Sequence, residues 1–252
     1  MWQRLSVLAL CGMSALWADA CDGLPTLGDG TGSSLIAPAV EVRPTLLLPQ
    51  ADPEPPQISY RLSVKPGLPA FRITVRNSPF ADIEVARCQD GRRLQLLPIM
   101  ADEGINLEGT FSAHDINFDG YLDLSVLRAF GLAGRYDPRS YWVYDPSSGL
   151  FVQNELTQVL GEKSNVDFDP KKHEISWFFI PSPPTPSCAD WGRYRVENNR
   201  LILIHKEEVT RSTQGPLEPD QPYCTVTVSD LIGGTMRVTE VRRFDAQGRS
   251  LK

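Results

Sequence analysis

The sequence predicts an all-β protein made of antiparallel sheets, with few and short helices. Short stretches alternate apolar and polar residues, as strands with one buried face do. Turn-forming residues separate these stretches, and Pro and Gly are frequent, with 21 and 19 residues among 252. A helical pattern is confined to one short stretch, 155–160. These observations fit a sandwich, a barrel or a propeller, and no clean repeat of about 40 residues selects among them.

The predicted strands begin with two hairpins. Residues 58–64 and 71–75 alternate around the turn sequence KPGLP, and 82–88 and 93–99 flank an Asp-Gly dipeptide that favours a tight turn. Further strands are expected at 122–127, 141–145, 149–153, 174–180, 191–197, 200–206, 222–229 and 235–245. One domain, residues 58–252, would contain all of them.

The composition limits the size and the partners of this domain. The chain is 41% hydrophobic and 22% charged, with a formal net charge of −6 at pH 7. That is enough apolar material for one core of ordinary density. Phosphate backbones are bound by clustered Lys and Arg, and the chain has no basic run, so we expect no nucleic-acid partner.

The N-terminus has the pattern of a secretory signal peptide, residues 1–20. An apolar run follows a single arginine, and the small residues Ala18 and Ala20 stand before Cys21. The run is shorter than the roughly 20 residues that a membrane-spanning helix needs. We therefore expect cleavage before Cys21 and export to the periplasm.

Cys21 lies directly after the expected cleavage point, and the sequence allows it to be either acylated or free. The segment resembles a bacterial lipobox, whose cysteine is acylated and anchors the protein to a membrane surface, although Ala18 stands where that pattern usually has Leu. A free Cys21 leaves four cysteines in the mature chain, and an acylated Cys21 leaves three. In an oxidising compartment both cases predict a Cys188–Cys224 disulfide. Residues 21–57, rich in Gly, Pro, Ser and Thr, are expected to form a flexible tether.

The stretch DINFDGYLD carries the clearest functional signal. Oxygen ligands recur at loop positions 1, 3, 5, 7 and 9, the seventh through its backbone carbonyl, and these positions are Asp115, Asn117, Asp119, Tyr121 and Asp123. Gly120 permits the sharp turn that brings such oxygens together. Carboxylate, amide and carbonyl oxygens favour Ca²⁺, whereas zinc prefers Cys and His. We therefore predict a Ca²⁺ site in this loop.

The loop differs from an EF-hand, and an ion in it would be structural, because all four ligand side chains are used to bind it and no residue nearby is placed for chemistry. Position 12 is Val126 instead of Glu, and the residues after the loop alternate like a strand. The ion would neutralise the clustered carboxylates and fix the start of that strand. The alternative is a metal-free turn whose Asp side chains accept hydrogen bonds from backbone amides.

Four stretches in this order resemble a known family: AHDINFDGYLDLSVL, AFGLAGRYDPRS, YWVYDPSSGLFVQNELTQV and WGRYRVENNRLILI. The family comprises bacterial periplasmic lipoproteins with one FG-GAP-like calcium loop in a distorted β-propeller-like fold. Its best-known members are immunity proteins that inhibit lysozyme-like peptidoglycan hydrolases delivered by bacterial-killing secretion systems. The resemblance covers residues 58–252 and is most specific in 113–152. It implies the propeller-like fold, the calcium ligands and an inhibitory function.

The residues contain no signature of an enzyme. The three histidines, His114, His173 and His205, stand outside any nucleophile or metal-hydrolase motif. We expect His173 in a surface turn and His205 on a sheet face or rim. An inhibitor of a lysozyme-like hydrolase is therefore the first hypothesis. A calcium-stapled structural or adhesive envelope protein is the second, and a cell-wall hydrolase is the third.

The partner surface is expected in the loop 129–140, which follows the calcium-anchored strand. Arg135 and Tyr136 are the residue types that dominate binding hot spots, and a bound ion would preorganise the loop. The alternative is that Tyr136 packs on the sheet and Arg135 pairs with Asp137. Two further candidate loops are 210–222 and 181–191.

Overall fold

The structure, a computed structural model, describes most of the expected domain. The described residues are 19–27, 57–76, 82–99, 111–128, 137–180, 188–212 and 222–251. Within these ranges the strands form three antiparallel sheets, accompanied by one seven-residue helix, so the predicted all-β class is confirmed. Among the described residues, no helix has the length and the apolar character that a membrane crossing requires.

The first sheet contains both predicted hairpins. Its strands are β1 (Gln57–Leu62), β2 (Phe71–Arg76), β3 (Asp82–Arg87) and β4 (Arg93–Pro98), paired in sequence order. Alternate residues of β2 face the core, where Phe71, Ile73 and Val75 are buried. Gly91, at a φ of 67°, takes the left-handed conformation that the β3–β4 connection needs.

The second sheet, which we call the middle sheet, carries the acidic loop. Its strands are β5 (Phe111–His114), β6 (Asp123–Leu127), β7 (Arg139–Asp145) and β8 (Leu150–Val152), again paired in sequence order. All five residues of β6 are buried, because neighbouring layers cover both of its faces. Helix α1 (Glu155–Gly161) follows β8, and the Asn154 side chain caps it by accepting a hydrogen bond from the Thr157 amide at 3.0 Å.

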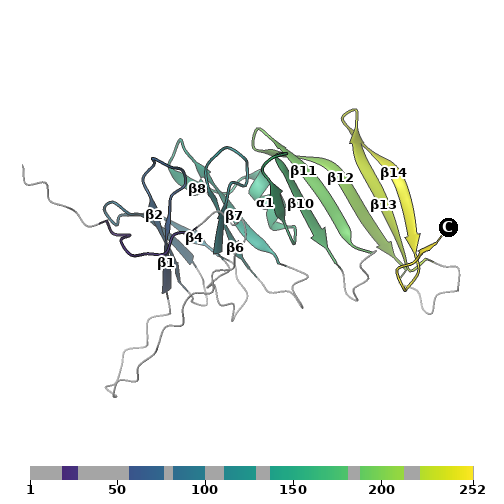
Figure 1. Ribbon diagram of the computed structural model, residues 1–252, viewed down its shortest axis with the longest axis horizontal. Coiled ribbons are helices and arrows are strands. Elements are labelled where there is room, and N and C mark those ends of the chain that lie inside the picture. Colours follow the sequence, from purple (N-terminus) through teal and green to yellow (C-terminus); the bar gives the residue numbers. More distant parts are fainter. Residues whose placement is uncertain are drawn as a thin grey trace, which may run out of the picture.

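The third sheet has seven strands and extends well beyond the other two (Figure 1). Its strands are β9 (Asp167–Asp169), β10 (Glu174–Phe179), β11 (Asp190–Glu197), β12 (Arg200–Arg211), β13 (Cys224–Ile232), β14 (Thr235–Phe244) and β15 (Ser250–Leu251). Asn198 and Asn199, at φ values of 52° and 61°, form the tight turn between β11 and β12.

The three sheets stack in layers, with the middle sheet between the other two (Figure 1). One face of the middle sheet packs on the first sheet, in a core that includes Leu62 and Trp142. Its other face packs on α1 and the start of the third sheet, in a core that includes Tyr141, Leu156 and Ile175. Four-stranded antiparallel sheets packed face to face are the arrangement of propeller blades, which supports the propeller-like class.

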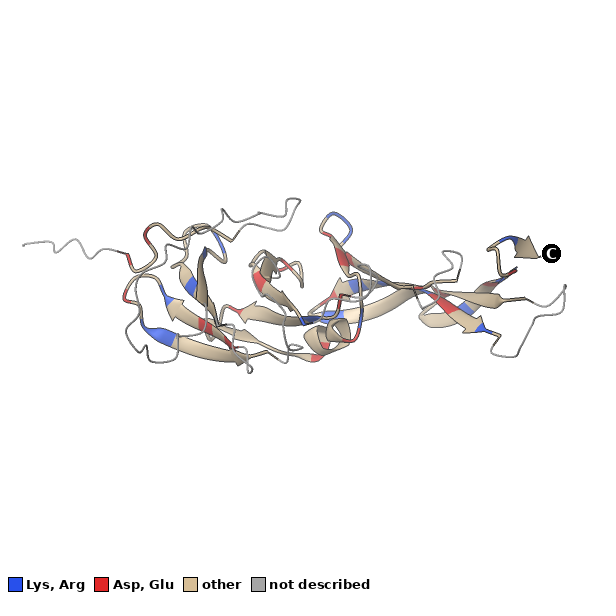
Figure 2. Ribbon diagram, turned by 90° about the horizontal axis from the view of Figure 1, so that it is seen from below, with Lys and Arg blue, Asp and Glu red and all other residues tan. Residues whose placement is uncertain are grey.

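The C-terminal half of the third sheet is a single layer (Figure 2). No residue of β14 is buried, and Val238 and Val241 are 61% and 51% exposed. One face of β13 is covered locally, where Cys224 and Val226 form a small core with Cys188. A disulfide joins Cys188 to Cys224, which is the predicted pairing.

The segment 19–27 is docked on the first sheet. Cys21 and Cys88 form a disulfide, the Leu27 amide donates to the Arg61 carbonyl at 2.8 Å, and the Arg61 amide donates to the Pro25 carbonyl at 2.9 Å. Of the two states left open for Cys21, the structure does not have the acylated one, because the sulfur that would carry the lipid thioether is bonded to Cys88. The expected tether is corrected at its start as well, since these residues belong to the folded domain.

Candidate functional site

The acidic loop, residues 115–122, connects β5 to β6 through a sharp turn. Phe118 and Gly120 lie in the left-handed region, at φ values of 60° and 84°. Glycine adopts this conformation without strain, whereas an aromatic residue does so only when its surroundings hold it there. The Phe118 ring is held by stacking on His173, with ring centroids 5.2 Å apart and an interplanar angle of 10°.

Amide groups orient the acidic side chains of the loop. Asp115 accepts hydrogen bonds from the Asp119 and Gly120 amides at 3.0 and 2.9 Å. Asp119 accepts one from the Tyr121 amide at 3.0 Å and one from the Asn117 side chain at 2.8 Å. These are the caps expected of a turn, and they also leave each carboxylate with lone pairs that can bind a cation.

Asp123, at the start of β6, is a carboxylate with 0% exposure. Its two oxygens accept hydrogen bonds from the Ile116 amide at 2.8 Å and the Tyr144 amide at 2.7 Å. Burial raises the pKa of Asp123 to about 8, and the charges of Asp119 and Asp115 contribute in the same direction. Burial also raises the pKa of Asp115. A nearby cation would reverse this penalty on the charged forms.

Residues of the loop contact all three sheets. The Leu122 amide donates to the Val64 carbonyl, in the β1–β2 connection, at 2.8 Å. The Asn117 side chain donates to the Asn199 side chain, in the β11–β12 turn, at 2.7 Å. The ring stack on Phe118 reaches the turn that precedes β10. The loop is therefore the point where the middle sheet is joined to both of its neighbours.

An open cavity of about 400 Å³ lies between the loop and the β1–β2 connection. Asp115 and Tyr121 line one side, and Lys65 lines the other with its ammonium 4.3 Å from the Tyr121 ring centroid. In the part of the chain that the structure describes, no ion pair involves Asp119, Asp115 or Asp123. The negative charge of the loop is thus left without a paired cationic side chain there.

The donor set fits a hard divalent cation. Carboxylate, amide and carbonyl oxygens are the ligands that Ca²⁺ takes in proteins. Among the described residues, Asp19, Cys21 and Cys88 form a group whose ligand-type atoms all lie within 4.8 Å of one another, but its two sulfurs are joined in a disulfide. The loop carboxylates do not form a group of this kind among the described residues. An ion held in the loop would be bound by Asn117 and the Tyr121 carbonyl together with the carboxylates.

The predicted partner residues Arg135 and Tyr136 lie outside the described residues. The base of their loop is described, where the Arg128 amide donates to the Pro138 carbonyl at 2.8 Å. The sequence reasoning did not find the residues that connect the loop to the other sheets. These residues are Val64, Lys65, His173 and Asn199.

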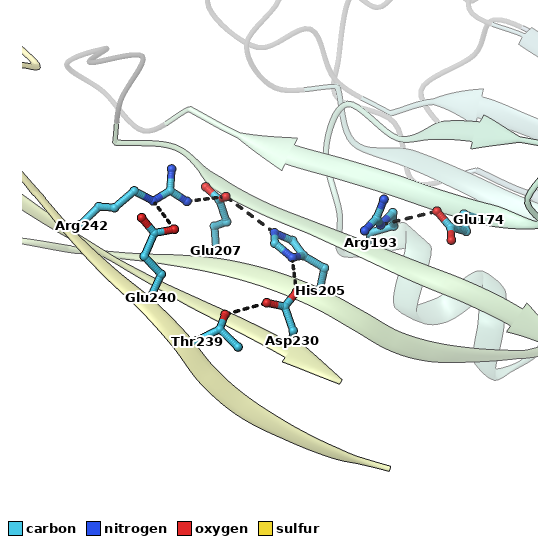
Figure 3. A network of polar contacts seen from close by, with 8 residues as sticks. All are labelled: Glu174, Arg193, His205, Glu207, Asp230, Thr239, Glu240 and Arg242. Atoms are coloured by element: carbon cyan, nitrogen blue, oxygen red, sulfur yellow. Dashed lines mark hydrogen bonds and ion pairs between the residues drawn. The ribbon is translucent and has the colours of Figure 1, made fainter. Parts of the chain in front are cut away.

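A second polar cluster lies on one face of the third sheet and is centred on His205 (Figure 3). His205 Nδ1 is 2.7 Å from an Asp230 oxygen, and Nε2 is 3.6 Å from a Glu207 oxygen. Arg242 donates to Glu207, and the Thr239 hydroxyl donates to Asp230, each at 2.6 Å. The Thr239 hydroxyl donates to the same Asp230 carboxylate that contacts the His205 imidazole. The contacts are those of a network that braces a single-layer sheet.

No protein-family model matches this chain, and no curated protein matches its sequence. A likeness to a solved structure does exist, described as that of a Xanthomonas type IV secretion system related protein. The two share 17% identity at a TM-score of 0.41, over 73% of this chain and 93% of the other. A likeness at this score carries no argument about function.

Proposed function

We propose that this chain is a calcium-stabilised periplasmic protein that binds and inhibits a lysozyme-like peptidoglycan hydrolase. The observation that carries the proposal is the acidic loop, which concentrates three aspartates at the junction of three sheets. The choice of partner rests on the resemblance of residues 113–152 to periplasmic immunity proteins. Calcium has a structural role in this proposal, and the chain has no catalytic activity of its own.

The calcium part of the proposal follows from the electrostatics of the loop. Asp115, Asn117, Asp119, Tyr121 and Asp123 would hold the ion. Among the described residues, the loop carboxylates form no ion pair with a cationic side chain. A bound Ca²⁺ would supply the positive charge that balances them. Because loop residues contact the first and third sheets, fixing the loop would strengthen the contacts of the middle sheet with both.

The two disulfides support a location outside the cytoplasm. Cys21–Cys88 and Cys188–Cys224 join residues 67 and 36 positions apart. Such bonds form and persist in oxidising compartments and are rare in the cytosol. With Cys21 in a disulfide, we propose a soluble periplasmic form.

A rigid β-scaffold that presents loops is a common architecture for binding proteins. The loop that contains Arg135 and Tyr136 begins directly after β6, which Asp123 ties to β7 through the Tyr144 amide at 2.7 Å. We therefore propose this loop as the surface that meets the hydrolase.

The test measures inhibition and catalysis in the same assay. Residues 21–252, purified from the periplasm, are mixed in calcium with a panel of lysozyme-like muramidases that includes egg-white lysozyme. The clearing of a peptidoglycan suspension is followed by turbidity. We expect equimolar protein to block at least one muramidase and to cause no clearing alone.

The double variant R135A/Y136A provides the matched control, because it removes the proposed contact residues and leaves the calcium loop intact. It should lose inhibition by about tenfold or more and keep the melting temperature of the wild type. The proposal fails if no muramidase is inhibited and none is recovered when the tagged protein is used as bait in a periplasmic extract. Clearing of peptidoglycan by the protein alone would favour the hydrolase hypothesis.

The second candidate is a structural or adhesive envelope protein. The single-layer part of the third sheet favours it, because Val238 and Val241 remain more than half exposed on β14, a strand with no buried residue. An adhesive protein would sediment with purified peptidoglycan and leave muramidase activity unchanged, so the same assay separates the two candidates.

A further inference from the structure

A second cavity, of about 220 Å³, opens between β7 and α1. It shares no lining residue with the cavity beside the acidic loop. The side chains important here are polar or charged and come from the residue after β6, from β7, from the residues before α1 and from α1 with its C-cap. They are Arg128, Arg139, Tyr141, Gln153, Gln158 and Glu162.

Tyr141 provides the first argument for a ligand. Its side chain belongs to the core between the middle sheet and α1, and it is 1% exposed. Tyr141 lines the cavity, and its buried phenolic oxygen has no hydrogen-bond partner among the described residues. Burial raises the pKa of Tyr141, so the phenol keeps its proton and can donate it. Buried hydroxyls are nearly always hydrogen-bonded, so this one indicates a partner beyond the protein atoms.

The two arginines provide the second argument. Arg128 donates to the Gly161 carbonyl, while its Nε is buried and has no acceptor in the described part of the chain. Arg139 donates to the Ser112 and Ser125 hydroxyls at 2.8 and 3.3 Å. Both arginines line the same cavity as Tyr141, and the charges of Arg139 and Arg128 lower the pKa of its phenol while that of Asp137 raises it. A phenol without a hydrogen-bond partner and an incompletely bonded arginine therefore belong to residues that line one small cavity.

The charge of the cavity gives the class of ligand. Arg128 and Arg139 contribute two positive charges to its lining, and Glu162 contributes one negative charge. Arginine binds carboxylate and phosphate oxygens because its planar donors match their geometry. A volume near 220 Å³ accommodates such a group and a few further atoms.

We propose that this cavity is a binding site for a small oxyanion, a carboxylate or phosphate group, which accepts hydrogen bonds from Tyr141 and Arg128. The site lies on the opposite face of the middle sheet from the first sheet, and it depends neither on calcium nor on the proposed inhibition of a hydrolase. Gln153 and Gln158 supply further amide donors at its rim.

The test uses the purified chain, residues 21–252, with inorganic phosphate and acetate as separate probes in isothermal titration calorimetry. We expect saturable one-to-one binding of at least one probe with a Kd below about 5 mM. The probe that binds more tightly identifies the tetrahedral or the planar oxyanion as the preferred group. The variant Y141F, which keeps the ring and removes the hydroxyl, should weaken binding about fivefold to tenfold. R128Q should weaken it further, because a charged donor is lost.

Two controls separate binding from folding and from general charge. Y141F should melt at the wild-type temperature or above it without the probe, because an unpaired buried hydroxyl is removed, and it should gain less from the probe than the wild type does. K163Q removes a positive charge next to α1, where Lys163 lies 4.8 Å from the Trp177 ring centroid, and should bind the probe normally. The proposal is overturned if neither probe shows saturable heat up to about 50 mM, or if Y141F and R128Q bind as tightly as K163Q.

Discussion

Asp123 is an acidic residue at a fully buried strand position, where an apolar residue is usual. It starts a strand whose five residues are all buried, and its oxygens are satisfied only by two backbone amides among its described contacts. Its pKa is raised from 3.8 to about 8, so the metal-free fold favours a protonated carboxyl that the unfolded chain does not. The calcium ion of the proposed function would bind the charged form and so would account for a carboxylate at this position.

The first prediction concerns pH and follows from the sign of this shift. Because the folded pKa is the higher one, the contribution of Asp123 to the stability of the metal-free protein is complete below pH 3.8 and is lost as the pH rises toward about 8. Calcium requires the ionised form, so the stabilisation by calcium should grow from about pH 5 to pH 8. Melting temperatures in calcium and in chelator at both ends of this range measure the difference. D123N should flatten the pH dependence in chelator, and an equal calcium effect at both pH values would contradict the assignment.

The second prediction concerns Asp119, whose carboxylate is held by the Tyr121 amide and the Asn117 side chain. D119A removes a proposed ligand, so it should lower stability by about 2–3 kcal/mol in excess calcium and much less in chelator. Thermal melts in the two conditions measure this. D22A, which removes an exposed acidic residue far from the loop in sequence, should have little effect in either condition. Equal losses for D119A in calcium and in chelator would show that Asp119 acts without a metal.

At the scale of elements, one pair in the third sheet shows how a glycine can be required inside a strand. Gly192 in β11 lies opposite Trp177 in β10. A Cβ atom on Gly192 would lie 2.6 Å from two atoms of the indole ring, which is closer than any normal contact. The missing side chain therefore makes room for Trp177, which is 8% exposed and supports the sheet next to α1.

The third prediction is that G192A destabilises the protein by about 1–3 kcal/mol, because the indole must move out of a packed position. Chemical denaturation of the variant and the wild type measures the free energy of unfolding. G161A is the matched control, since its Cβ would meet only the Arg139 carbonyl at an ordinary 3.6 Å. If G192A unfolds at the same denaturant concentration as the wild type, the indole does not need this space.

The elements themselves were largely predictable from the sequence, because the longer strands alternate in polarity and end at turn residues. The strands that the prediction omitted are β5, β9 and β15, with four, three and two residues. Strands this short contain few positions to show an alternation, and β8, with three residues, was predicted together with the turn residues that precede it. β12 ends at Arg211 and not at 206, because its pairing with β13 continues into polar residues that the pattern cannot distinguish from a loop.

Much of the candidate site was predictable as a motif, but its surroundings were not. The spacing of the acidic residues indicates a loop with its own turn glycine, whereas the bond from Asn117 to Asn199 joins residues 82 positions apart. Such contacts depend on how the sheets stack, which residue patterns do not determine. The pairing of Cys21 with Cys88 is a similar case, since counting cysteines leaves connectivity open.

At the scale of the whole molecule, a layered part is followed by a single-layer extension (Figures 1 and 2). In the layered part the middle sheet shares a core with each neighbour. The acidic loop adds polar contacts to both neighbours at one end of these cores. An ion in the loop would therefore act on the stability of all three layers rather than on one connection.

Hydrogen exchange of the mature chain in calcium and in chelator tests this central claim most directly. We predict that calcium slows exchange at the loop amides, at the Leu122 amide that binds the Val64 carbonyl, and in the neighbouring strands β2 and β11 of the outer sheets. D119A should exchange in calcium as the wild type does in chelator. Identical exchange of the wild type in both conditions, or slowing confined to residues 115–122, would contradict the claim that an ion in this loop holds the three sheets together.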